Sequence, residues 1–268
     1  MGDSGFSALR SSLLSRYGLD ISGYKQNFVE RRLELRMKAR GSDSYSAYSR
    51  LVASEPEEYR RLLETLSINV SEFFRNPPAF NALWGCLEEI FLRKTERGQH
   101  FVRIWSAGCS EGEEPYTISI TLHELLADLL PSYSVSITAT DIDADALSKA
   151  QSGAYPPSKL KNVGSALLEK YFSRQEKLYA VAPRVKSLVR FSEKSVLDAK
   201  EMGNFDLVVC RNLLIYFERQ QQQVIFENMR QALHKGGYLF LGNTETLPPD
   251  EARHYETVDA ASRIYRKL

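Results

Sequence analysis

From about residue 100 onward, short apolar runs alternate with helical stretches, and this alternation constrains the fold more than any other feature of the chain. The candidate strands are FVRIWSA (101–107), VSITATD (135–141), SLVRFSE (187–193), FDLVVCRN (205–212) and YLFLGN (238–243). Helical patterns lie between them near 113–130, 143–151 and 218–234. We expect Gly236 and Gly237 to end the last of these helices. Strands that alternate with helices predict a doubly wound, mostly parallel α/β sheet, to which the tail 257–268 adds an antiparallel pair or edge.

The first third of the chain has a different pattern, with apolar residues at three- and four-residue spacing and no strand-like run. This spacing predicts a small all-helical domain. Pro77 and Pro78 cannot lie in the interior of a helix, so 70–78 is a candidate linker. A length of 268 residues suits one large and one small unit. We therefore divide the chain into a helical domain with its linker (1–77) and an α/β domain (78–268) that carries a small inserted subdomain at about 152–186.

Composition excludes several classes of protein. Lys plus Arg (35) nearly cancel Asp plus Glu (34), so no global field favours nucleic acid or an anionic membrane surface. The three cysteines are widely spaced and the four histidines form no H-E-x-x-H pair, so we expect neither a disulfide framework nor a metal site. No stretch approaches the ~20 apolar residues that span a bilayer, and the N-terminus lacks a signal-peptide core. We expect a cytoplasmic protein without membrane insertion.

A candidate ligand loop, WSAGCSEGEEPYT (105–117), lies where the first strand of the α/β domain ends and a helix begins. Gly108 and Gly112 allow a tight turn, and the helix start offers free N–H groups. The loop has neither G-x-G-x-x-G nor G-K-[ST], which favours a ligand without a pyrophosphate. A purely structural turn, with Glu113 and Glu114 as ordinary first-turn acids, explains the same residues equally well.

A second candidate contact is Asp141, at the end of the next strand in ATDID. Ligands bind at the carboxyl edge of open parallel sheets, and an acid there can accept both ribose hydroxyls. The alternative is that Asp141 or Asp143 only caps the following helix. Together with the glycine loop, this acid favours a nucleoside ligand.

Four ordered motifs then resemble one family, the chemotaxis receptor methyltransferases of the CheR type. The motifs are NVSEFFR (69–75), RIWSAGCSEGEEPYT (103–117), ATDIDADALSKAQSGAY (139–155) and FDLVVCRNLLIYF (205–217). The resemblance implies a class I methyltransferase fold and an enzyme that methylates glutamate side chains, a protein-glutamate O-methyltransferase. It implies S-adenosylmethionine as cofactor, S-adenosylhomocysteine as product, and the cytoplasmic helical bundle of a chemoreceptor as partner.

The resemblance also implies a set of site residues. The implied cofactor contacts are Asn69, Ser71, Arg75, Glu114, Asp141, Ser195, Val196, Arg211 and Asn212. Glu114 would hold the amino group of the methionine moiety, although the sequence does not separate it from Glu113, and Asp141 would hold the ribose. Ser195 stands in place of the asparagine expected beside the adenine. Arg75 and Tyr216 are the catalytic candidates, placed to orient the substrate carboxylate.

The segment KQNFVERRLELRMKAR (25–40) is locally basic, and Arg32, Arg36 and Arg40 recur at four-residue spacing on one helix face. Such a face is usually only solvated. A glutamate-rich receptor bundle would make these three arginines substrate contacts, while the interleaved Phe28, Val29, Leu33 and Met37 pack on the domain core.

Two other functions remain open from the sequence. A nucleic-acid methyltransferase would bind RNA or DNA in a salt-sensitive way, which the neutral charge disfavours. A catalytically silent signalling module would bind the cofactor or a partner without forming esters.

Some family members tether themselves to a receptor tail through the inserted subdomain, using a glycine-bearing loop. The stretch between Phe172 and Phe191 is short and has no glycine, so we predict no receptor-tail tether.

Overall fold

The computed structural model describes residues 2–67, 71–199 and 202–268, and it divides into two compact units. The helical unit comprises Met1–Ile68 together with Tyr216–Gln222. The sheet unit comprises Asn69–Ile215 and Gln223–Leu268. The division along the chain thus lies between Ile68 and Asn69, before the linker that we proposed at 70–78. No helix in the described ranges is long and apolar enough to cross a membrane.

The helical unit contains α1 (Gly2–Tyr17), α2 (Gln26–Arg40), α3 (Tyr45–Ser54) and α4 (Pro56–Leu66). Local signals place the helix ends: Gly41 closes α2 with a φ of 62°, and the Ser44 side chain accepts the Ala47 N–H at the start of α3. The apolar positions of the four helices meet in one core, which includes Leu9, Leu13, Val29, Leu33, Tyr48, Val52 and Leu62. Phe28 and Met37, which we expected in this core, are only partly buried against it.

The sheet unit is built on a seven-stranded sheet with the order β6-β2-β1-β7-β8-β10-β9. Its strands are β1 (Phe101–Ala107), β2 (Ser134–Asp141), β6 (Val189–Glu193), β7 (Phe205–Cys210), β8 (Leu233–Leu241), β9 (Tyr255–Asp259) and β10 (Ile264–Lys267). The first five strands in the spatial order pair in parallel, whereas β10 is antiparallel to both β8 and β9. The chain begins at the centre of the sheet and winds outward in both directions, so the predicted doubly wound fold is confirmed.

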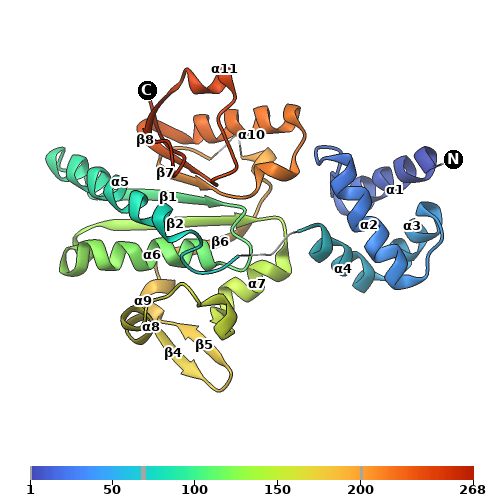
Figure 1. Ribbon diagram of the computed structural model, residues 1–268, viewed down its shortest axis with the longest axis horizontal. Helices are drawn as coiled ribbons and strands as arrows, with labels where there is room; N and C mark the ends of the chain where they lie inside the picture. The colour runs from blue at the N-terminus through green and yellow to red at the C-terminus, as the bar shows by residue number, and fades with distance from the viewer. Residues whose placement is uncertain (1, 68–70, 200–201) are drawn as a thin grey trace. The chain divides into compact units, whose positions relative to one another are not determined.

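Helices cover the sheet, and Figure 1 shows its strands between α10 on one side and α6 on the other. The helices of this unit are α5 (Pro77–Glu96), α6 (Glu113–Leu126), α7 (Ala144–Ser152), α8 (Ser165–Tyr171), α9 (Pro183–Lys186), α10 (Arg219–Ala232) and α11 (Pro249–Ala252). The first residues of α10 group with the helical unit. Every residue of β7 is buried, as its continuous apolar run predicts for a strand covered on both faces.

The insertion after α7 forms a small three-stranded antiparallel sheet with the order β3-β5-β4. Its strands are β3 (Ala154–Tyr155), β4 (Phe172–Gln175) and β5 (Leu178–Val181). Aromatic side chains fasten it, because Tyr155 and Phe172 both pack edge-on against the buried Phe73, at ring distances of 4.9 and 5.1 Å. Glu176, with a φ of 50°, lies in the tight turn that joins β4 to β5.

One local expectation was wrong: Gly236 and Gly237 do not end the helix before β8 but lie inside that strand. Helix α10 ends earlier, at Ala232. A Cβ at Gly237 would lie 3.0 Å from the carbonyl oxygens of His234 and Phe205, so the glycine permits a close backbone approach. The β7–β8 pairing also shifts register next to Phe205.

Candidate functional site

The candidate site lies at the carboxyl edge of the sheet, where the loops after β1, β2 and β7 meet. The first two loops are joined directly, because the backbone N–H groups of Gly108 and Cys109 donate to the carbonyl of Thr140 at 2.8 and 3.0 Å. Gly108 and Gly112 have φ values of 72° and 92°, which favour glycine. Because β1 is the strand from which the chain winds in both directions, this edge is the topological switch point where open α/β sheets bind ligands.

Glu114 points toward this edge. Ser106 Oγ donates to its Oε1 at 2.7 Å, and Arg211 NH1 lies 3.8 Å from its Oε2. The Glu114 side chain is 13% exposed, and burial raises the pKa of its carboxyl above the usual value. A nearly buried carboxylate at a ligand-binding edge is suited to a cationic group.

Glu113, its neighbour, faces another way. It is fully buried, and Lys159 Nζ lies 2.6 Å from its Oε1. Burial raises the pKa of Glu113, while the hydrogen bond from Lys159 opposes that rise. Glu113 therefore ties the start of α6 to the insertion, and the two adjacent glutamates have different surroundings.

Asp141 joins the loops after β2 and β1. Its Oδ2 accepts the Ser110 N–H at 2.8 Å and its Oδ1 accepts the Asp143 N–H at 3.0 Å. Burial raises the pKa of Asp141, against the effect of these hydrogen bonds. The cap of α7 is Asp143, whose Oδ1 accepts the N–H groups of Asp145 and Ala146 at 3.0 and 3.1 Å. The capping role that we weighed for either aspartate thus belongs to Asp143.

Arg211 links β7 to the segment before α5. Its NH2 donates to the carbonyl of Arg75 at 3.0 Å, and its guanidinium lies over the rings of Phe80 and Phe240 at 5.1 and 4.8 Å. Burial lowers the pKa of Arg211, although Glu114 opposes that change. The buried Nε has no hydrogen-bond partner among the described residues. Asn212 follows with a φ of 58°.

The segment before α5 carries three predicted cofactor contacts. Asn69 lies outside the described residues. Ser71 and Arg75 are half-buried. The segment is anchored next to them, because the Phe73 N–H donates to the Lys159 carbonyl at 3.0 Å and the Phe74 N–H donates to Thr117 Oγ1 at 3.1 Å. Contacts distant in sequence thus hold this part of the chain beside α6 and the insertion.

Ser195 and Val196 follow β6 at the same edge. The Ser195 Oγ accepts the N–H of Leu197 at 3.2 Å and so caps a short 3-10 turn. Val196 is buried, and its carbonyl accepts a hydrogen bond from Asn228 Nδ2 at 3.0 Å. The Ser195 hydroxyl therefore has a structural role.

Tyr216 belongs to the helical unit, unlike the other described residues of the implied cofactor and catalytic set. Its carbonyl accepts the Lys25 N–H at 2.9 Å, and its ring contacts that of Phe28 at 5.0 Å. The next residue, Phe217, forms a β-bridge with Tyr24 and stacks on its ring at 4.5 Å. No sequence motif indicated this docking on the start of α2.

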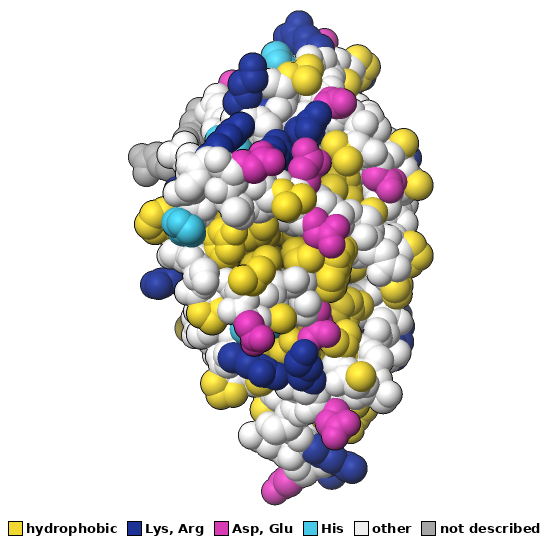
Figure 2. All heavy atoms as spheres, turned by 90° about the vertical axis from the view of Figure 1, so that its left-hand side faces the viewer, with side chains coloured by type: hydrophobic (Ala, Val, Ile, Leu, Met, Phe, Trp, Pro, Cys, Tyr) yellow, Lys and Arg dark blue, Asp and Glu magenta, His cyan; other side chains and the backbone are white. Residues whose placement is uncertain are grey.

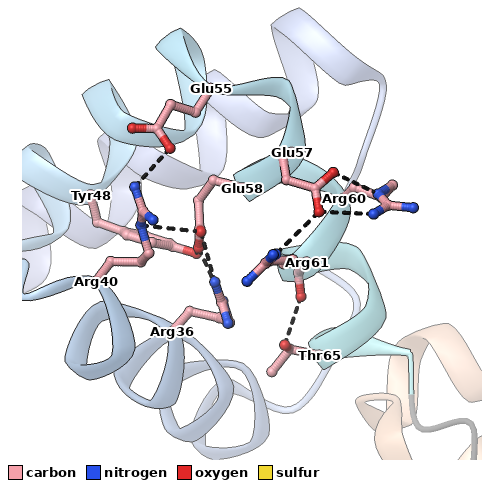
Figure 3. A network of polar contacts seen from close by, with 9 residues as sticks. All are labelled: Arg36, Arg40, Tyr48, Glu55, Glu57, Glu58, Arg60, Arg61 and Thr65. Atoms are coloured by element: carbon pink, nitrogen blue, oxygen red, sulfur yellow. Dashed lines mark hydrogen bonds and ion pairs between the residues drawn. The ribbon is translucent and has the colours of Figure 1, made fainter.

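Two of the three arginines predicted on α2 are paired inside the helical unit (Figure 3). Arg36 NH2 lies 2.7 Å from Glu58 Oε2, and Tyr48 OH donates to Glu58 Oε1 at 2.7 Å. Arg40 NH2 lies 2.7 Å from Glu55 Oε2. Burial raises the pKa of Glu58, but the hydrogen bonds from Arg36 and Tyr48 outweigh it and hold that pKa below its usual value.

Arg32 is placed differently. Its guanidinium lies 5.6 Å from the centre of the Phe28 ring, and within the described residues it forms no ion pair. A surface hollow of about 310 Å³ opens here, lined by Asn27, Phe28, Arg31 and Arg32. Arg31 and Arg32 thus place positive charge in the first half of α2, close to Phe28, whose ring contacts that of Tyr216.

The amino ends of the parallel strands form a second hollow, of about 550 Å³. Its buried acid, Asp206, is already paired, with Lys94 Nζ at 2.8 Å and His234 Nε2 at 2.7 Å. Figure 2 faces this side of the sheet and shows apolar side chains at its centre, with charged groups above and below them. Lys94 and His234 thus pair with Asp206 at the amino edge of the sheet, away from the carboxyl edge.

Two family models match this chain, one over the helical unit and one over the sheet unit. The model of the family described as "CheR methyltransferase, SAM binding domain" matches residues 69–264, and that of "CheR methyltransferase, all-alpha domain" matches residues 4–67. The "Probable chemotaxis protein methyltransferase" of Rhizobium etli is 34% identical over 90% of this chain and 92% of its own length. The "Chemotaxis protein methyltransferase" of Escherichia coli is 31% identical over 94% of this chain and 88% of its own length.

Proposed function

The chain belongs to the CheR methyltransferase family, and from this premise we propose that it methylates glutamate side chains on the cytoplasmic helical bundle of chemoreceptors. It is an S-adenosylmethionine-dependent methyltransferase of chemotaxis. The observation that carries the proposal is the pair of carboxylates, Glu114 and Asp141, on neighbouring loops of the carboxyl edge. The reaction belongs in the cytoplasm, where the proposed substrate lies.

The residues at this edge fit S-adenosylmethionine. Arg211 NH1 is 3.8 Å from Glu114 Oε2, longer than a charge-assisted hydrogen bond of ~2.7–2.9 Å, so this carboxylate can still accept from an amino group. The Asp141 oxygens accept backbone N–H groups, and a carboxylate has about four lone-pair sites, so it can also accept from a ribose hydroxyl. Ser71, Arg75, Val196, Arg211 and Asn212 complete the proposed pocket, together with Asn69 and the backbone at Ser195.

The bound cofactor supplies an electrophilic methyl group, whose transfer leaves S-adenosylhomocysteine. A glutamate side chain has a pKa of ~4.3 and is ionised at neutral pH, so the chain needs no general base. Its task is to place the substrate oxygen and to exclude water. We assign the orientation of the substrate carboxylate to Arg75 and Tyr216.

The direct test is incubation with methyl-labelled S-adenosylmethionine and receptor cytoplasmic fragments. We expect base-labile label on glutamate, because methyl esters hydrolyse in base whereas methyl groups on nitrogen do not. Fragments whose candidate glutamates are changed to alanine serve as the control and should stay unlabelled. Cofactor binding without any ester would instead support a silent signalling module, and label on RNA or DNA would support a nucleic-acid methyltransferase.

We propose that the basic face of α2, with Arg32, Arg36 and Arg40, meets the acidic receptor. Because Arg36 and Arg40 also hold Glu58 and Glu55, a triple alanine variant would mix binding and folding effects. The cleaner change is Arg31→Glu with Arg32→Glu. It should raise the KM for the receptor fragment by about tenfold at low salt, since charges at an interface rim act on encounter.

The matched control reverses the same amount of charge on α4, with Arg60→Glu and Arg61→Glu. Both arginines are more than half exposed, and both pair with Glu57 on their own helix. Steady-state kinetics should show an unchanged KM for this control and unchanged cofactor affinity in both variants. An equal KM increase in the two variants would assign the effect to net charge and not to α2.

The inserted subdomain leads to a further expectation, that no receptor tail is needed. The turn between β4 and β5 is tight, and β4 is an edge strand with exposed residues after Phe172. A compact turn leaves little freedom to accommodate an added strand, although an exposed edge can in principle accept one. Calorimetric titration with receptor C-terminal peptides should give no heat of binding. Micromolar affinity mapped to 152–186 would contradict this expectation.

A further inference from the structure

Glu245, in the loop after β8, is a buried carboxylate that belongs to none of the sequence motifs described above. It is 4% exposed. We infer that Glu245 is a positioning residue for the cofactor site, which holds the loop that carries Arg211 and Asn212. The inference rests on the cofactor role proposed above for those two residues.

The Glu245 carboxylate accepts hydrogen bonds from the backbone of two loops. Its Oε2 accepts the N–H of Asn212 at 2.8 Å and that of Gly242 at 2.7 Å. Its Oε1 accepts the N–H of Leu214 at 2.7 Å. These bonds fasten the loop after β7 to the loop after β8. Both oxygens are used as acceptors, which is the chemistry of an ionised carboxylate.

The two loops approach each other closely around Glu245. Asn212 has a φ of 58°, a left-handed conformation that glycine and asparagine adopt more readily than other residues. At Gly242 an added Cβ would lie 2.6 Å from Glu245 Oε2 and 2.8 Å from the Asn212 nitrogen. The two loops thus approach through their backbones, and the carboxylate fills the space between them.

The loop that Glu245 holds leads directly to the candidate site. Arg211 precedes Asn212, donates to the Arg75 carbonyl at 3.0 Å and lies 3.8 Å from Glu114. A shift of the Asn212 backbone would move Arg211 with it. Misplacement of site groups by about 1 Å can cost a hundredfold in function, so the geometry of this loop matters for binding.

The test is Glu245→Gln, measured by calorimetric titration with S-adenosylhomocysteine. The side-chain amide replaces one acceptor oxygen by a donor, so at least one backbone N–H loses its partner. The matched control is Asp206→Asn. Asp206 lies at the amino end of β7, the strand that leads to Arg211. Asp206 is 2% exposed and its Oδ2 accepts the Arg103 N–H at 2.8 Å, but it lies at the opposite edge.

At temperatures below its unfolding transition, we expect the Glu245→Gln variant to bind S-adenosylhomocysteine at least about tenfold more weakly than the wild type does. A loss of this size is typical of a hydrogen bond to a charged group. Amide exchange at Asn212 and Leu214 should become faster. Asp206→Asn should unfold more easily yet bind normally. If Glu245→Gln fails to fold, Glu245→Asp keeps both acceptors on a shorter side chain and should bind with intermediate affinity.

Wild-type affinity in the folded Glu245 variant, or an equal loss in Asp206→Asn, would overturn the inference and leave Glu245 a stabilising residue only. The measurement uses the product alone and no receptor. It therefore succeeds or fails independently of whether the methyl acceptor is a receptor glutamate.

Discussion

Replacing Asp141 with alanine should weaken cofactor binding by about 1.5–3 kcal/mol, the range for hydrogen bonds to charged groups. The reason is that its two oxygens, which the backbone N–H groups of Ser110 and Asp143 hold in place, are the proposed acceptors for the ribose hydroxyls. Calorimetry with S-adenosylhomocysteine measures the loss directly. Unchanged affinity in this variant would remove Asp141 from the cofactor site.

Asp143→Ala is the matched control, two residues away. This change removes the cap of α7, which should lower the free energy of unfolding by about 1 kcal/mol. It leaves the backbone N–H of residue 143, which Asp141 accepts, in place. Product affinity should therefore stay close to that of the wild type, and a comparable loss would mean that the loop as a whole, and not Asp141, determines binding.

Replacing Glu58 with alanine should destabilise the helical unit by about 3 kcal/mol, at the low end of the range for breaking a buried ion pair. Glu58 is 2% exposed and holds both the Arg36 guanidinium and the Tyr48 hydroxyl (Figure 3). The low end applies because the Arg36 side chain is 15% exposed, so water can partly hydrate its guanidinium once the Glu58 carboxylate is gone. Amide hydrogen exchange in α2 and α4 reports this unit separately from the sheet.

The control is the adjacent Glu57→Ala. Glu57 also pairs with two arginines, Arg60 and Arg61, which lower its pKa to about 2, but its side chain is 53% exposed. Solvent-exposed pairs contribute little, so exchange in α2 and α4 should hardly change. Similar destabilisation by both variants would show that helix charge, and not burial, explains the Glu58 effect.

The pH dependence of stability gives an independent readout for Glu58. Its pKa is lowered in the folded protein, so its contribution is complete above the unfolded value of ~4.3 and disappears as pH falls through the folded value. Acid should therefore destabilise the wild-type helical unit more than the Glu58→Ala variant. Parallel pH profiles would mean that this carboxylate does not contribute to stability.

The sequence was most informative where local pattern decides structure. Alternating apolar runs and helices predicted the parallel sheet, and the continuous run 205–210 predicted a strand buried on both faces. Because parallel strands end at a common edge, the positions of Gly108 and Asp141 along the chain were enough to place them together. The motifs that resemble the CheR family lie on these same loops, and the comparisons confirm that family.

Tertiary structure decided which partner each charged or aromatic side chain has. Adjacent glutamates 113 and 114 look alike in sequence, but only the insertion supplies Lys159 to the first of them. Tyr216 docks on the start of α2, and Glu245 binds the loop after β7, through contacts between segments far apart in the chain. Periodicity specifies which face or edge a residue occupies. It does not specify which distant segment packs there, because that depends on how the elements assemble, and so Arg36 and Glu58 became partners only in the folded protein.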